Sequence, residues 1–175
     1  MADFPGKVNT QTSPSEPQRS YGTTAMADMD FIRSIPGILL IVEIFVGLLV
    51  WSLIASTSYT LLPVYGWVMF VSVTLWLLSI ALFVVLLLRF YQSLPSVPWP
   101  LVLMVFYVVA AVLYVTAFLA DAVSVPPQWY PWHGHLGASA FFAIVVTLLY
   151  GASSYFAYLD WMGEGQNAAA STVPV

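Results

Sequence analysis

Four apolar stretches alternate with short polar segments along the chain. They run over residues 36–56, 66–88, 99–120 and 137–159, and three of them contain no Asp, Glu, Lys or Arg. An α-helix rises about 1.5 Å per residue, so about 20 residues cross a hydrocarbon core of roughly 30 Å. Each stretch reaches that length. The pattern therefore predicts an all-α integral membrane protein whose four transmembrane helices pack as a bundle.

The polar segments divide the chain into three parts. Residues 1–30 are rich in Pro, Ser and Thr and hold too little apolar surface to offset the entropy of ordering. We expect them to be a disordered tail, followed by a four-helix transmembrane domain over residues 31–162. Residues 163–175, rich in Ala and Gly, are expected to form a second disordered tail.

Composition narrows the classes of function. Only 7% of the residues are charged and 61% are hydrophobic, whereas soluble domains carry roughly 25% charged residues. The chain holds no basic cluster of the kind that binds nucleic acid. It also has no cysteine, which excludes disulfides, thiolate metal sites and thiol redox chemistry. We expect one membrane domain without cofactor or metal.

The basic residues predict the orientation. Lys7, Arg19, Arg33 and Arg89 all fall on one side of the predicted membrane, and the first and third loops have none. Because Lys and Arg are enriched in cytoplasmic segments, both termini and the second loop are expected in the cytosol.

Glu43 is the one charged residue inside the apolar stretches. An ionised acid at the centre of a helix costs about 3 kcal/mol on insertion scales. Gly47 lies four residues further on the same face, where another helix could approach closely. One hypothesis is a proton or cation site in a small carrier. The favoured one is a protonated, hydrogen-bonded acid that fixes the register of the helices.

The third apolar stretch offers partners for this acid. Tyr107 and Tyr114 are seven residues apart, with Asp121 seven further on. A tyrosine hydroxyl can donate to a carboxylate or accept from a protonated acid. We therefore expect these three residues and Glu43 to form the polar part of the bundle interior.

Other residues have packing or anchoring roles. Ala143, Thr147 and Gly151 follow one another at spacings of four, a strip that permits close helix packing within the chain or between two copies. Tryptophans near helix ends are expected to anchor the bundle at the membrane surfaces, and these are Trp67, Trp99 and Trp161.

Motifs for chemistry are weak. His133 and His135 form an H-x-H in the third loop, but a zinc site needs a third ligand and only Asp121 is near in sequence. The chain has no Gly-rich phosphate loop and no paired nucleophile and base. We expect no catalytic residues and no enzymatic activity.

Several segments resemble a known family. The sequence YGWVMFVSV at residues 65–73, and Glu43 followed by Gly47, Val50 and Trp51, are similar to the myelin-and-lymphocyte protein group of MARVEL-domain tetraspans. Residues 97–104 (VPWPLVLM) and 113–118 (LYVTAF) resemble the same group. The similarity covers nearly the whole chain and is weakest in the third loop.

The resemblance implies a four-helix MARVEL bundle with cytosolic termini and no enzymatic activity. It also implies a proteolipid of myelin or apical plasma membrane and of endosomal and Golgi-derived vesicles. Such proteins associate with cholesterol- and sphingolipid-rich domains, self-associate, and support vesicle trafficking through cargo proteins. An oligomeric ion pore or a proton-coupled carrier that uses Glu43 remains the alternative hypothesis.

Overall fold

The computed structural model describes residues 29–93 and 96–171. Every element in these ranges is helical, and four helices are long and apolar enough to cross a membrane, as predicted. Most of the predicted tail 1–30, the last residues 172–175, and the basic residues Lys7 and Arg19 lie outside the described ranges. The elements in chain order are α1 (Met29–Arg33), α2 (Ile35–Ala55), η1 (Tyr59–Leu61), α3 (Pro63–Leu87), η2 (Phe90–Ser93), α4 (Trp99–Ser124) and α5 (His133–Ser171).

Helix boundaries follow local chemistry. The Ser34 side chain accepts a hydrogen bond from the Gly37 backbone N–H, which caps the start of α2. Proline near the first position opens both α3 and α4, where its missing N–H costs nothing. Beyond the end of α3, Arg89 has a φ of 54°, a left-handed turn that redirects the chain into η2.

Gly37 is required where α1 meets α2. A side-chain Cβ at this position would overlap the Phe31 carbonyl oxygen. Since only glycine lacks that atom, the chain can fold α1 tightly back against the first turn of α2.

The predicted and observed boundaries differ at both ends of the described domain. Met29 and Asp30, assigned to the disordered tail, are part of α1. The fourth transmembrane helix was expected to end at residue 159, with disorder from 163, but α5 continues to Ser171. Alanine has the highest helix propensity, and a helix that is already formed extends without a new nucleation step. The Ala-rich end of the chain therefore prolongs α5 beyond the apolar span.

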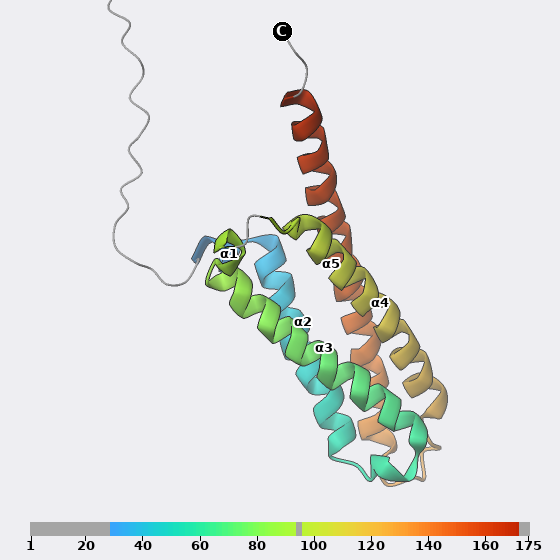
Figure 1. Ribbon diagram of the computed structural model, residues 1–175. Helices are drawn as coiled ribbons and strands as arrows, with labels where there is room; N and C mark the ends of the chain where they lie inside the picture. The colour runs from blue at the N-terminus through green and yellow to red at the C-terminus, as the bar shows by residue number, and fades with distance from the viewer. Residues whose placement is uncertain (1–28, 94–95, 172–175) are drawn as a thin grey trace, which may run out of the picture.

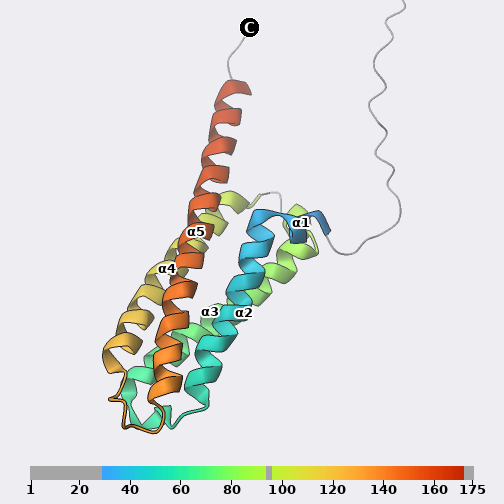
Figure 2. The ribbon, with the colours of Figure 1, turned by 180° about the vertical axis from the view of Figure 1, so that it is seen from behind.

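The helices pack around a closed ring. α2 lies against α3, α3 against α4, α4 against α5, and α5 against α2. Figures 1 and 2 show the pair α2/α3 and the pair α4/α5 converging at the end that carries η1 and diverging at the other end. α1 and the far end of α5 both lie at the divergent end, where α5 projects beyond the other helices.

Buried residues recur at spacings of three and four on each helix. On α4 they are Tyr107, Ala110, Tyr114, Ala117 and Asp121. This heptad pattern is the signature of left-handed bundles, in which each helix presents one narrow stripe to its neighbours. The stripes on the other helices run through Gly37, Leu40, Glu43, Gly47, Val50 and Ile54 on α2; Tyr65, Val68, Ser72, Leu75 and Ser79 on α3; and Leu136, Ser139, Ala143, Val146, Tyr150, Ser153 and Ala157 on α5.

Large apolar side chains lie on the outside of the bundle. Phe45, Phe70, Phe141 and Leu148 are each more than 60% exposed. In water such a surface would drive aggregation, whereas acyl chains are as apolar as leucine and solvate it. The inward stripes, by contrast, are rich in Gly, Ala, Ser and Tyr. Small and polar residues of this kind suit helix packing inside a bilayer.

Candidate functional site

Glu43 is buried in the middle of the bundle and is 1% exposed. Its Oε1 atom accepts a hydrogen bond of 2.5 Å from the Ser153 hydroxyl on α5. Ser153 itself is only 4% exposed. The pair therefore joins two helices that are 110 residues apart in the chain, through a contact that water does not reach.

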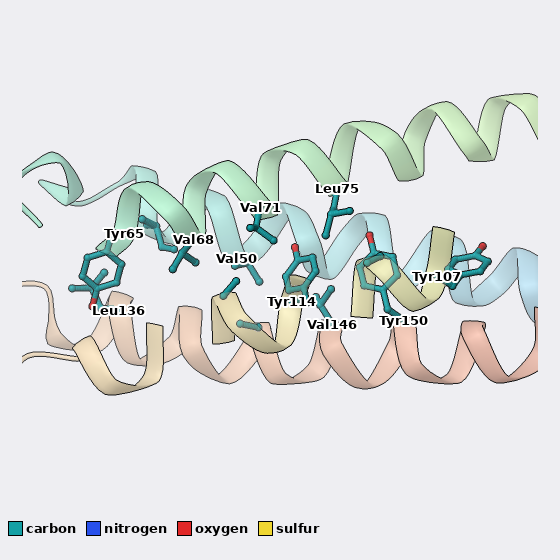
Figure 3. Packing of buried hydrophobic residues seen from close by; sticks show 14 of the residues in the cluster. Val50, Tyr65, Val68, Val71, Leu75, Tyr107, Tyr114, Leu136, Val146 and Tyr150 are labelled. Atoms are coloured by element: carbon teal, nitrogen blue, oxygen red, sulfur yellow. The ribbon is translucent and has the colours of Figure 1, made fainter. Parts of the chain in front are cut away.

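Tyrosine rings surround this pair. Tyr107 and Tyr114 from α4 and Tyr150 from α5 all lie within electrostatic range of the Glu43 carboxyl. The Tyr150 hydroxyl is 2.7 Å from the Ser79 hydroxyl of α3 and hydrogen-bonds to it. Figure 3 shows the three rings following one another along the interior of the bundle. Polar side chains from all four transmembrane helices thus lie in this part of the interior.

A second buried acid, Asp121, lies near the convergent end of the bundle. Asp121 has no exposed surface, and its Oδ2 atom accepts a hydrogen bond of 2.7 Å from the Ser139 hydroxyl of α5. The neighbouring Tyr65 hydroxyl donates to the Ser124 carbonyl oxygen at 2.9 Å, which ties α3 to the end of α4. This end of the bundle is therefore held by polar contacts on three helices.

The two acids share one design. Each carboxyl is bound by a serine of α5, and Ser139 and Ser153 are fourteen residues apart, close to four complete turns. The other oxygens, Glu43 Oε2 and Asp121 Oδ1, are buried and have no hydrogen-bond partner among the described residues. A buried polar group without a hydrogen bond costs about 1–3 kcal/mol. Each serine therefore supplies a hydrogen bond that lowers the cost of burying its carboxyl group.

The structure brings the predicted polar residues together only in part. Glu43, Gly47, Tyr107 and Tyr114 are all buried on the inward stripes of α2 and α4, and a Cβ at Gly47 would be 3.6 Å from the Tyr114 hydroxyl. The hydrogen bond to Glu43, however, comes from Ser153 rather than from either tyrosine.

Asp121 does not belong to the Glu43 cluster. The third apolar stretch was predicted to end at residue 120, but α4 continues through Asp121 to Ser124. The fourteen residues between Tyr107 and Asp121 correspond to about 21 Å along a helix, so the two acids cannot share one site. The missed signal was the spacing of Ser139 and Ser153 on the helix that looked purely like a packing surface.

Gly47 lies where the interior is narrow. A Cβ added there would be 3.6 Å from both Trp76 Cδ1 and the Tyr114 hydroxyl. Trp76 donates from its indole nitrogen to the Ile44 carbonyl oxygen at 3.0 Å and packs edge-on against Trp51. Both rings therefore pack at the contact between α2 and α3. Trp76 lies in the middle of its span and not at the membrane surface.

The strip Ala143, Thr147 and Gly151 turns across α5. Ala143 is fully buried, the Thr147 hydroxyl donates to the Ala143 carbonyl oxygen at 2.8 Å, and a Cβ at Gly151 would meet open space. Because a spacing of four residues exceeds one helical turn of 3.6 residues, each successive residue of the strip is displaced around the helix axis. The strip therefore turns away from the bundle interior between Ala143 and Gly151. Ala143 packs within the chain, and Gly151 is on an open side.

Trp67 and Trp99 lie near the starts of α3 and α4, whereas Trp161 lies ten residues before the end of α5. Trp67 is 43% exposed, and its indole nitrogen donates to the Thr116 hydroxyl at 3.3 Å. Trp161 is exposed beside Tyr158, and Trp99 lies edge-on against Tyr91. An amphipathic ring in such a position suits the headgroup boundary. Their anchoring role stays a prediction.

The histidines of the third loop do not converge on a third ligand in the described part of the chain. No group of three or more His, Cys, Asp or Glu side chains occurs there with a geometry for metal binding. His133 Nδ1 instead lies 2.6 Å from the Pro126 carbonyl oxygen and closes the loop at the start of α5. This contact is structural.

The sequence matches known proteins over its full length. The MARVEL membrane-associating domain matches residues 31–156. Plasmolipin from Danio rerio is 73% identical over 175 residues and covers all of both chains, and plasmolipin from Homo sapiens is 46% identical, covering 98% of this chain and 96% of its own. The human CKLF-like MARVEL transmembrane domain-containing protein 8 is 39% identical over 88% of this chain and 90% of its own length. No solved structure was found to match the chain.

These matches agree with the geometry. The matched domain contains α2, α3, α4 and the bundle part of α5, together with both serine–acid pairs. The resemblance inferred from residues 65–73 and from the Glu43 segment is thereby confirmed. The chain is a multi-pass membrane proteolipid that belongs to the MARVEL family of membrane-associating domains.

Proposed function

We propose that this protein organises membrane domains and supports vesicle trafficking, without catalysing a reaction. The observation that carries the proposal is the division of side chains between the inside and the outside of the bundle. The buried acids are bound to serines of the same chain, and the outside is covered by large apolar side chains. Such a surface interacts with the surrounding lipid.

Helix length supplies the physical basis for sorting. α3 has 25 residues and α4 has 26, which correspond to about 37–39 Å. Hydrocarbon cores measure about 27 Å in thin internal membranes and about 32–33 Å in sterol-rich plasma membranes. The shorter α2, with 21 residues, spans about 32 Å. A mismatch costs fractions of a kcal/mol per Å, so all three helices fit thicker, ordered lipid better than a thin membrane.

Self-association strengthens this preference. One protomer gains little from a better-matched bilayer, whereas a cluster multiplies the gain by its number of copies. We infer that the protein forms homo-oligomers in cholesterol- and sphingolipid-rich domains of plasma membrane and of endosomal or Golgi-derived vesicles, with both termini and their cargo contacts in the cytosol. The relatives named plasmolipin support this assignment by their similarity alone.

An ion pore or proton-coupled carrier centred on Glu43 is the rival hypothesis. Within one protomer, the bundle between Glu43 and the convergent end is filled by fully buried side chains, including Val50, Ile54 and Val68. A conducting path would require these residues to separate. The organising role needs no such movement, which favours it.

Bilayer thickness provides the test. Labelled protein would be reconstituted in vesicles whose phosphatidylcholine chains are lengthened stepwise, and its mixing between coexisting thin and thick phases would be measured. We expect enrichment in the thicker phase that increases with protein density. Equal distribution at every thickness and density would contradict the proposal.

A further inference from the structure

A cleft opens where the two helix pairs diverge. It has a volume of about 890 Å³ and lies between α1, the start of α2, the end of α3, the beginning of α4 and residues 153–164 of α5. Figures 1 and 2 show these elements around the divergent end of the bundle. Small-molecule sites have volumes of about 300–1,000 Å³, so the cleft is large enough for one amphiphile.

The inward stripe of α5 changes character along this cleft. Ser153 and Ala157 are buried at its inner end, and the same alternating spacing of four and three continues through Asp160 to Glu164, which are exposed at its mouth. The eleven residues from Ser153 to Glu164 correspond to about 16 Å of helix. The cleft therefore extends along α5 from buried residues to two exposed acids, and most of its other lining is apolar.

The inner end of the cleft lies at the hydrogen-bonded pair of Ser153 and Glu43. Ser153 lines it and donates to Glu43, whose second carboxylate oxygen is buried without a partner among the described residues. On the adjacent helix α4, Leu103 and Tyr107 follow Trp99 at successive spacings of four and line the same side of the cleft as α5. An aliphatic chain would contact apolar side chains from the entrance almost to Ser153.

The charges and aromatic rings at the entrance indicate which kind of ligand head group the cleft would accept. Asp160 and Glu164 are the charged residues among the described lining, which contains no Lys or Arg. Tyr91 and Trp99 lie edge-on with ring centroids 6.4 Å apart at the same entrance. Aromatic faces combined with acids are the chemistry that recognises alkylammonium groups.

We propose that this cleft binds a single-chain amphiphile with a cationic ammonium head. The head lies between the acids of α5 and the Tyr91 and Trp99 rings, and the chain runs inward past Leu103 toward Ser153. An anionic head would face two carboxylates at the entrance and would be excluded. This site is independent of the organising role, since either could fail without the other.

The test uses the full-length protein in non-ionic maltoside micelles. The probe is a tetradecyl trimethylammonium that carries a nitroxide at the chain end, and the matched control probe has the same chain with a sulfonate head. Electron paramagnetic resonance measures the immobilised fraction. We expect a saturable immobilised component for the cationic probe, displaced by unlabelled tetradecyl trimethylammonium and absent for the sulfonate.

Two variants separate the site from the general surface. Asp160→Asn combined with Glu164→Gln leaves the buried seam intact and should weaken cationic binding about tenfold. Asp30→Asn removes an exposed acid of α1 that does not line the cleft and should change binding less than twofold. Equal immobilisation of both probes, no saturable component, or a double variant that binds like the parent would each overturn the proposal.

Discussion

Replacing Ser153 by alanine tests whether the serine–acid pair stabilises the bundle. The change removes the 2.5 Å hydrogen bond to Glu43 Oε1, and Oε2 already lacks a partner among the described residues. A buried polar group left unsatisfied costs about 1–3 kcal/mol, while single interhelical hydrogen bonds in membranes reach about 1.7 kcal/mol. We expect Ser153→Ala to lower the free energy of unfolding by about 1–2 kcal/mol.

The adjacent serine is a matched control. The Ser154 hydroxyl donates at 2.7 Å to the Gly151 carbonyl oxygen of its own helix, a bond that contributes little to stability because it forms within one helix. Ser154→Ala should therefore cost less than about 0.5 kcal/mol. Reversible unfolding in mixed micelles of mild and denaturing detergent, followed by circular dichroism, measures both variants.

A double-mutant cycle identifies the partner. Glu43→Ala and Ser153→Ala, alone and combined, should show a coupling energy of at least about 0.5 kcal/mol, as expected for two groups in contact. Equal costs for the two serine variants, together with strictly additive effects of Glu43→Ala and Ser153→Ala, would refute the role of this pair.

Three further predictions concern other positions. Glu43→Gln keeps a hydrogen-bond acceptor and should leave the folded, surface-delivered fraction unchanged, whereas Glu43→Leu should reduce it; equal delivery of both would exclude a polar role. Gly47→Leu should reduce the yield of folded monomer because the site is enclosed, whereas Gly151→Leu should fold and alter only self-association measured by single-molecule photobleaching. Tyr65→Phe removes the bond to the Ser124 carbonyl oxygen and should lower stability by about 1 kcal/mol, measured by the same unfolding assay; an unchanged midpoint would show that this bond contributes nothing.

The sequence predicted the spans because length and hydropathy alone determine them. It did not predict which face of each helix points inward. In a soluble helix the apolar face marks the interior, but here both faces are apolar and the outside carries residues such as Phe45 and Leu148. The inward stripe is recognisable instead by small and polar residues at heptad spacing, which connects Ser139 with Ser153 on α5.

Partners across the bundle were also beyond the sequence. Glu43 was predicted to be a buried, paired acid from its position in an apolar span; in the structure it is 1% exposed and accepts a hydrogen bond from Ser153. The sequence could not identify the hydrogen-bond donor to Glu43. Serines and tyrosines on three other helices could each reach its carboxyl group if the helices were shifted relative to one another. Tyr65 shows the same difficulty, since nothing in the sequence indicated that its ring is fully buried and that its hydroxyl donates to the Ser124 carbonyl oxygen.

The most direct test of the organising role combines two signals in the same giant vesicles. Purified protein would be reconstituted in membranes with coexisting ordered and disordered phases, with a fluorescent label for partitioning and an encapsulated dye for ion flux. The account predicts enrichment in the ordered phase and no flux above protein-free vesicles. Flux that disappears with Glu43→Leu, without enrichment in the ordered phase, would contradict it and identify Glu43 as the centre of a pore.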